Sequence, residues 1–122
     1  MKEITIDGIT YDLVKRENCT LLSWRMPNIE ELLSAVDYGK HDPATSMEGF
    51  TSSGYWSSSS NVSNSKYAWN VNFKYGYSYN YSKTLEGYVR CVRTDENGNL
   101  VWGKSSDYPM TWEDAQIWCE KQ

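Results

Sequence analysis

Residues 67–73 read YAWNVNF, and this stretch decides the fold class of the chain. Large residues occupy its odd positions, so an extended strand would place them together on one face. Ala68, Asn70 and Asn72 would lie on the opposite face. The alternation predicts a half-buried β-strand whose large residues face a core and whose small and polar residues face solvent.

More strands are predicted before and after this one. Residues 55–59 (YWSSS) begin a strand meander, residues 77–81 (YSYNY) alternate again after a turn, and residues 88–93 (YVRCVR) close the set. Near the start of the chain, apolar residues alternate on either side of Asp7-Gly8, which is a strong short-range signal for a β-hairpin.

Two short helices are predicted from their caps and from apolar residues that recur every three or four positions. In residues 24–36, Asn28 is placed to cap a helix that has one apolar face. In residues 110–121, Thr111 is placed as the cap. The predicted buried stripe of this second helix consists of Trp112, Ala115, Trp118 and Cys119. Short strands and two short helices in one domain of 122 residues predict the α+β class.

The same segments supply the predicted core, and a polar loop separates the first helix from the meander. Residues 37–54 form this loop, in which the single histidine, His41, is expected to be solvated. The predicted core residues are Trp24, Trp56, Trp69, Val71, Phe73, Val89, Cys91, Trp102, Trp112 and Trp118.

Composition narrows the function classes. With 12 basic and 16 acidic residues the formal charge is −4, which argues against nucleic acid as a partner. Neither a signal peptide nor a run of transmembrane length is visible, so we expect a chain made in the cytoplasm and not held in a membrane. Such a chain could still act within a virion or in the cytosol of a host cell.

Four segments in order resemble a known bacterial family. Residues 24–33 (WRMPNIEELL), 55–59, 67–73 and 88–93 are similar to the helix start and the strands of the Lcl C-terminal domain family. That family belongs to the C-type-lectin-like and formylglycine-generating-enzyme-like fold group. The resemblance implies a C-type-lectin-like fold, with two short helices packed on a twisted antiparallel sheet. The N-terminal hairpin, within residues 1–20, would be an addition to it.

The tail also resembles the family, but in a different order. Residues 99–104 and 111–119 are similar to the family's opening strand and helix, yet here they follow the closing strand. We therefore expect a single domain over residues 1–122, divided into a hairpin extension (1–20), a helix and meander (24–93) and a displaced strand and helix (94–122). Circular permutation explains this order. There are two alternatives. The chain could be one register cut from an array of repeated domains, or a dimer could exchange its last helix.

The resemblance also implies that two of the three cysteines are neighbours. Cys119, on the displaced helix, would lie beside Cys91 on the closing strand. The pair would form a disulfide in an oxidising compartment and remain two buried thiols in a reducing one. Cys19 has no counterpart in the family pattern.

The meander between residues 57 and 83 carries the candidate binding surface. Tyrosine beside serine and asparagine is typical of antibody binding loops, where rigid aromatic contacts stand beside adaptable hydrogen-bonding groups. The stretch also resembles the variable region of C-type-lectin-like proteins that retroelements diversify, which occur in phages and on bacterial surfaces. The candidate ligand-binding residues are Asn61, Asn64, Lys66, Asn70, Asn72, Lys74, Tyr75, Tyr77, Tyr79 and Tyr81.

The favoured function is therefore non-catalytic binding of a protein or a glycan, for example in phage or bacterial surface adhesion. The first alternative is a small phage-type intracellular inhibitor that docks on a host protein. The second is a formylglycine-generating type of enzyme that binds copper through Cys91 and Cys119. No metal or cofactor is expected, because carboxylates are absent from residues 51–85. A monomer or a small homo-oligomer is expected.

Overall fold

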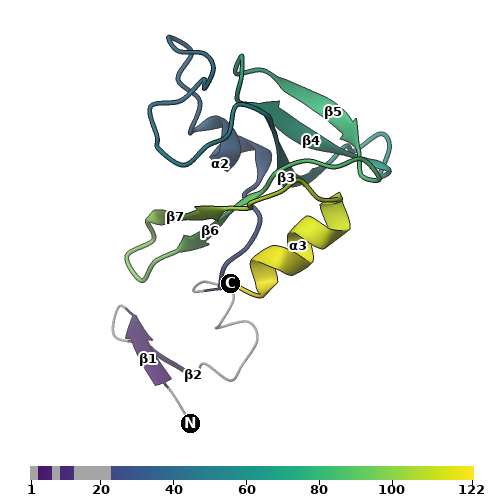
Figure 1. Ribbon diagram of the computed structural model, residues 1–122. Coiled ribbons are helices and arrows are strands. Elements are labelled where there is room, and N and C mark those ends of the chain that lie inside the picture. The colour runs from purple at the N-terminus through teal and green to yellow at the C-terminus, as the bar shows by residue number, and fades with distance from the viewer. Residues whose placement is uncertain (1–2, 7–8, 13–22) are drawn as a thin grey trace.

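The computed structural model describes residues 3–6, 9–12 and 23–122, and its helices and strands are short (Figure 1). In chain order, they are β1 (Glu3–Ile6), β2 (Ile9–Asp12), α2 (Ile29–Leu33), β3 (Gly54–Ser60), β4 (Tyr67–Asn72), β5 (Ser78–Ser82), β6 (Arg90–Thr94), β7 (Leu100–Ser105) and α3 (Trp112–Glu120). The α+β class is confirmed. β1 pairs antiparallel with β2, as predicted, while Asp7, Gly8 and Cys19 lie outside the described residues.

The strands form three small antiparallel sheets, in the orders β1-β2, β3-β4-β5 and β6-β7, and not the single sheet that was expected. The meander and the closing strand meet through one isolated parallel bridge, between Tyr55 and Tyr88. Next to this bridge, the backbone of Gly87 exchanges two hydrogen bonds of 2.9 Å with Met110, just before α3.

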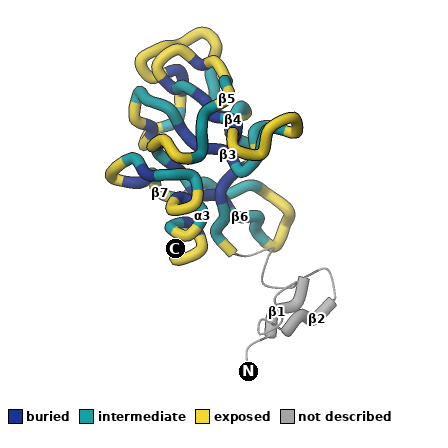
Figure 2. The backbone as a smooth tube through the Cα atoms, turned by 90° about the vertical axis from the view of Figure 1, so that its right-hand side faces the viewer, coloured by how far each residue is buried: buried dark blue, intermediate teal, exposed yellow. Residues whose placement is uncertain are grey.

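The β3-β4-β5 sheet separates two apolar cores. Neighbouring residues of β3 point to opposite faces, so Tyr55 enters one core and Trp56 the other, and both are fully buried. The core around Trp56 includes Ala115 and Cys119 of α3. The core around Tyr55 includes Leu32 of α2. Figure 2 shows the central strands buried and the connecting loops exposed.

The prediction that β4 has one solvated face is therefore wrong. Ala68 and Asn70 are completely buried, because the segments around Gly87 and Met110 cover their side of the sheet. On the other face, Trp69 is only half-buried and Tyr67 is exposed. Of the ten predicted core residues, Trp56, Val71, Phe73, Val89 and Cys91 are fully buried, and the other five are half-buried.

A capping box begins α2 at Asn28, as the sequence predicts. The Glu31 amide donates to Asn28 Oδ1 at 2.8 Å, and the Asn28 amide donates back to the Glu31 carboxylate at 2.9 Å. Arg25 donates to both oxygens of the same carboxylate, at 2.7 and 2.8 Å. These bonds, led by the one from Arg25, hold the pKa of Glu31 below its usual value. The helix ends at Leu33, earlier than the apolar pattern suggested.

Replacing Asn28 by alanine is expected to lower the free energy of unfolding by about 1 kcal/mol, because the Glu31 amide loses its acceptor. Chemical denaturation by urea, followed by tryptophan fluorescence, measures this change. Asn28→Ser is the matched control, since serine also caps helices and should restore most of the loss. An alanine variant as stable as the parent would show that the cap contributes nothing.

The last helix packs against the core of its own chain. Thr111 Oγ1 accepts from the Asp114 amide at 3.4 Å and caps α3, as predicted. Ala115 and Cys119 are fully buried, and the half-buried Trp112 and Trp118 pack beside them, which confirms the predicted stripe. Cys119 forms a disulfide with Cys91. The helix α3 thus completes the core around Trp56.

Candidate binding surface

Four tyrosine rings form a row along β5 and the turn before it, which we call the tyrosine row. The ring centroids of Tyr75, Tyr77, Tyr79 and Tyr81 are 6.4, 5.5 and 5.6 Å apart in succession. The first two rings are 60% and 52% exposed, and the last two are half-buried. Aromatic rings at these spacings attract one another. The row is therefore a preformed surface with an apolar body and polar hydroxyl ends.

The hairpin between β4 and β5 positions this row. Asn72 Oδ1 accepts hydrogen bonds from the backbone amides of Lys74 (2.8 Å) and Tyr75 (3.2 Å), which fixes the turn. Gly76 follows at a φ of 90°, a conformation that a residue with a Cβ rarely adopts. Beyond the turn, alternate residues of β5 share one face, so Tyr79 lies opposite Asn70 and Tyr81 opposite Ala68.

The side chain of Tyr79 acts as a neutral phenol. Burial, together with the neighbouring Tyr81 and Tyr77, raises the pKa of Tyr79 to about 12. Its hydroxyl therefore stays protonated at neutral pH and can donate as well as accept. Lys74 Nζ lies 5.5 Å from the centre of the Tyr75 ring and adds a cation at the exposed end.

Three of the predicted asparagines shape loops. The side-chain oxygens of Asn61, Asn64 and Asn72 all accept backbone amides two or three residues further on. Asn61 Nδ2 also donates to Asn80 Oδ1 at 2.7 Å. Asparagine favours such local turns, so these residues hold the loops that flank the row. Lys66 and Lys74 are exposed.

Asn70 does not lie on an outer surface, although the alternation placed it with the ligand-binding residues. Its side chain is 0% exposed, and neither its Oδ1 nor its Nδ2 has a hydrogen-bond partner. Among the ten candidates, the structure thus brings the four tyrosines and Lys74 together at the surface. Asn70 lies beneath them, and Asn61, Asn64 and Lys66 lie in the loop between β3 and β4.

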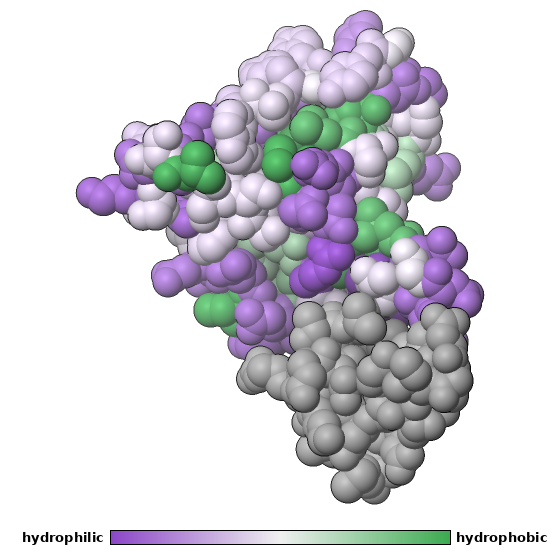
Figure 3. All heavy atoms as spheres, turned by 180° about the vertical axis from the view of Figure 1, so that it is seen from behind, coloured by the Kyte–Doolittle hydropathy of each residue, from purple (hydrophilic) through white to green (hydrophobic). Residues whose placement is uncertain are grey.

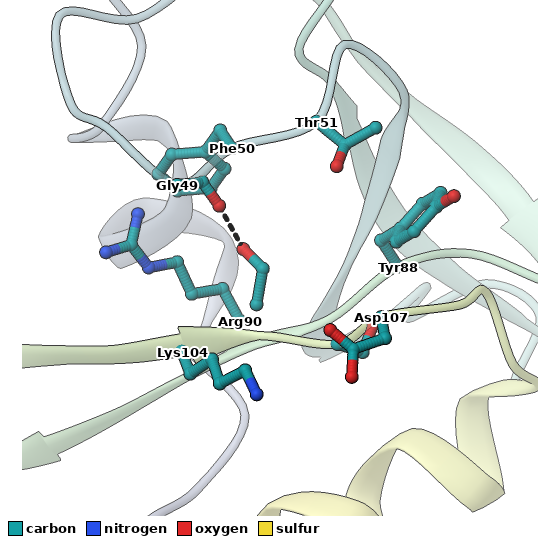
Figure 4. Close-up of a pocket in the computed structure, with 9 residues that line it drawn as sticks. Gly49, Phe50, Thr51, Tyr88, Arg90, Lys104 and Asp107 are labelled. Carbon is teal, nitrogen blue, oxygen red and sulfur yellow. Dashed lines mark hydrogen bonds between the residues drawn. The ribbon is translucent and has the colours of Figure 1, made fainter.

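A pocket of about 460 Å³ on another part of the molecule was not predicted from the sequence (Figure 4). It forms where the loop at Gly49–Thr51 meets Tyr88, Arg90 and the end of β7. Figure 4 shows Lys104 and Asp107 on the side of β7, and Phe50 and Thr51 on the loop side. No local pattern could reveal it, because its walls come from segments about 40 residues apart in the chain.

Arg90 connects two walls of this pocket, the loop before β3 and the strand β7. Its Nε donates to the Gly103 carbonyl at 2.7 Å and its Nη1 to the Glu48 carbonyl at 2.8 Å. Its guanidinium lies 4.7 Å from the centre of the Phe50 ring. Ser105 Oγ donates to the Gly49 carbonyl, so a second bond ties the same loop to β7. The pKa of Arg90 is lowered by burial, and these contacts stabilise the pocket wall.

The described residues offer no metal centre, and the face drawn in Figure 3 carries no broad apolar patch. Among residues 3–6, 9–12 and 23–122, no group of three or more His, Cys, Asp or Glu side chains could hold a metal ion. On the face drawn in Figure 3, apolar residues form small groups between polar ones. Within the described segments, no helix is both long and apolar enough to cross a membrane.

Comparison with known proteins identifies the family. The model of the Lcl C-terminal domain matches residues 10–93, which is well over half of the chain. No curated protein and no solved structure matches the chain. The match includes the helix α2, all strands of the meander and most of the closing strand β6. The chain belongs to the Lcl C-terminal domain family.

Proposed function

We propose that this domain is a non-catalytic binding module that recognises a protein or a glycan through the tyrosine row. The observation that carries the proposal is the row itself. Four rings touch in succession, and the two at its end are more than half exposed. Such rings supply large contact area at a low entropic cost, because each has only two rotatable side-chain bonds. The exposed Lys74 and Ser78, which are adjacent in the chain to Tyr75, Tyr77 and Tyr79, can supply hydrogen bonds.

The state of the cysteines supports binding outside a reducing cytosol. Cys91 and Cys119 are bonded to each other and almost completely buried. Disulfides persist in oxidising compartments, which favours an adhesive or receptor-binding module over an intracellular inhibitor. A pair bonded in this way also leaves no free thiolates for copper, which favours binding over formylglycine-generating chemistry.

The proposal includes a C-type-lectin-like fold in permuted order. The family match ends at residue 93, and the segment that resembles the family's opening, residues 99–119, follows it. In this chain α3 packs on the core around Trp56 and is joined to β6 by the disulfide. A displaced first helix that still reaches the closing strand is the arrangement expected of a permuted domain.

Replacing Tyr75 and Tyr77 by alanine together is expected to weaken ligand binding at least tenfold and to leave the unfolding midpoint nearly unchanged. Exposed aromatic anchors often dominate binding energy, whereas their truncation opens no cavity in a core. The ligand is first selected with the purified domain from an array of immobilised glycans and from a peptide display library. Dissociation constants of the selected ligand are then compared by surface plasmon resonance.

Tyr38 and Tyr108 provide a matched control, because they are 77% and 60% exposed and lie outside the row. The double variant Tyr38→Ala/Tyr108→Ala removes the same side-chain atoms and should bind like the parent. Equal losses in both double variants, or none in the Tyr75/Tyr77 variant, would refute the tyrosine row as the binding surface.

A further inference from the structure

A buried side-chain amide without partners lies at the centre of the β3-β4-β5 sheet. Asn70 is 0% exposed, and neither its Oδ1 nor its Nδ2 makes a hydrogen bond. Buried polar groups in folded proteins are almost always paired, so an unpaired amide calls for a specific explanation. The cost of leaving it unpaired is compensated if another molecule provides the missing bonds.

A small cavity lies at this amide. It has a volume of about 240 Å³, and its lining includes Asn70, Asn72, Tyr79, Tyr81 and Glu86. Pockets that hold drug-sized molecules measure roughly 300–1,000 Å³, so this cavity suits one residue of a larger ligand. Two of its walls are rings of the tyrosine row, so the cavity opens within the surface proposed for binding.

Two glycines leave room for the polar atoms of Asn70. A Cβ on Gly54 would lie 2.6 Å from both Asn70 Oδ1 and the Tyr79 hydroxyl oxygen, and a Cβ on Gly87 would lie 3.1 Å from Asn70 Nδ2. Contacts below 3.0 Å do not occur at real Cβ atoms, so a side chain at Gly54 would displace the amide or the phenol. The two backbone positions that flank the amide therefore carry no side chain.

Tyr79 is the wall of the cavity that covers the amide. Its phenol end lies beside Asn70 Oδ1, and its hydroxyl has no hydrogen-bond partner among the described residues. The hydroxyl of Tyr81, in contrast, donates to the Glu86 carbonyl at 3.3 Å. A ligand group can reach the covered amide when the Tyr79 side chain turns outward. That movement breaks no hydrogen bond, although it separates the Tyr79 ring from the rings of Tyr77 and Tyr81.

We infer that this cavity binds the side-chain carboxamide of a glutamine or asparagine in a partner protein. An amide offers one acceptor and two donors, and a second carboxamide matches both at once in a planar, paired arrangement. A carboxylate fits poorly, because it cannot donate to Asn70 Oδ1 and because Glu86 lies at the same cavity. This inference rests on the proposed function and assigns its ligand to the protein class.

The test uses two nearly isosteric probes and the side-chain amide signal of Asn70. N-acetyl-glutamine amide and N-acetyl-glutamate amide are titrated into the ¹⁵N-labelled domain, and the Asn70 NH₂ resonances are followed by NMR. We expect a saturable shift with the glutamine probe and at least a tenfold weaker response to the glutamate probe. No saturable shift, equal responses to the two probes, or a shift with methyl glucoside alone would overturn the inference.

Asn70→Leu gives a second readout. The variant should lose the response to the glutamine probe, because the carboxamide that would pair with the probe has been removed. Asn80→Leu, which changes an exposed amide on the neighbouring strand, should keep the response. A response to the glutamine probe that persists in Asn70→Leu, or that is lost in Asn80→Leu as well, would contradict the inference.

The two proposals can fail separately. If the Tyr75/Tyr77 double variant loses binding but Asn70 does not respond to the glutamine probe, the carboxamide inference is wrong and the tyrosine row remains the binding surface. If Asn70 responds but the double variant binds its ligand normally, the cavity binds carboxamides without the exposed end of the row. That second outcome supports the inference and refutes the role of Tyr75 and Tyr77.

Discussion

Trp56→Ala is expected to lower the free energy of unfolding by about 3–5 kcal/mol, the range for removing a large aromatic side chain from a core. Trp56, on β3, is the largest of the fully buried side chains and belongs to the core that includes α3. Its Nε1 donates to the Met110 carbonyl at 2.8 Å, and its ring lies 5.3 Å from that of Tyr81. Alanine would leave a cavity at the junction of β3, α3 and the tyrosine row.

Urea denaturation followed by circular dichroism measures the loss. Trp69→Ala is the matched control: it removes the same atoms from the neighbouring strand, where the side chain is only half-buried, and should cost less. If the Trp56 variant does not fold, Trp56→Phe keeps most of the ring, loses the bond to Met110 and is expected to cost about 1–2 kcal/mol. A Trp56→Ala variant as stable as Trp69→Ala would contradict the role assigned to Trp56.

The sequence predicts those parts of the fold that local chemistry determines. The cap at Asn28 and the stripe of α3 appear as expected, because caps and apolar spacing act within a few residues. The helix α2 is shorter than the spacing of its apolar residues suggests. Ser34 is its C-cap, so Val36 lies in the loop that follows. The order of sheets was not predictable locally, since Gly87 pairs with Met110, which lies more than twenty residues further along the chain.

The candidate site, too, could be predicted from the sequence only in part. The composition of β5 correctly marked an unusual concentration of tyrosine, and the structure shows those rings in contact. The position of Asn70 could not be predicted, because a polar residue that alternates with apolar ones is normally solvated. Only tertiary contacts, from Gly54 and Gly87 on either side, reveal that its amide is buried. The pocket at Arg90 was missed for the same reason.

Reduction of the Cys91–Cys119 disulfide is the second large effect that we expect. The two cysteines are 28 residues apart in the chain. In the chain-entropy treatment, a cross-link over a loop of this length stabilises the folded state by about 3–4 kcal/mol, through restriction of the unfolded chain. The disulfide ties α3 to β6, and both sulfurs lie within the core around Trp56. Reduction should therefore loosen the attachment of α3 as well.

The measurement compares urea unfolding with and without a reductant. A chain carrying Cys19→Ser serves as the parent, so that no third thiol can exchange with the pair. Cys91→Ala/Cys119→Ala in that parent is the control, because it should be destabilised and should not respond to the reductant. An unchanged midpoint on reduction of the parent would contradict the predicted contribution of the bond.

The size of the loss also separates the two settings proposed for the domain. Domains of this size have total stabilities of roughly 5–15 kcal/mol, so a loss of 3–4 kcal/mol takes a chain at the low end close to unfolding. A parent that unfolds or releases α3 on reduction would be confined to an oxidising compartment, as expected of an adhesive module. A parent that keeps its structure and its ligand when reduced could act in the cytosol. That result would favour the hypothesis of an intracellular inhibitor that binds its host protein through the same tyrosine row.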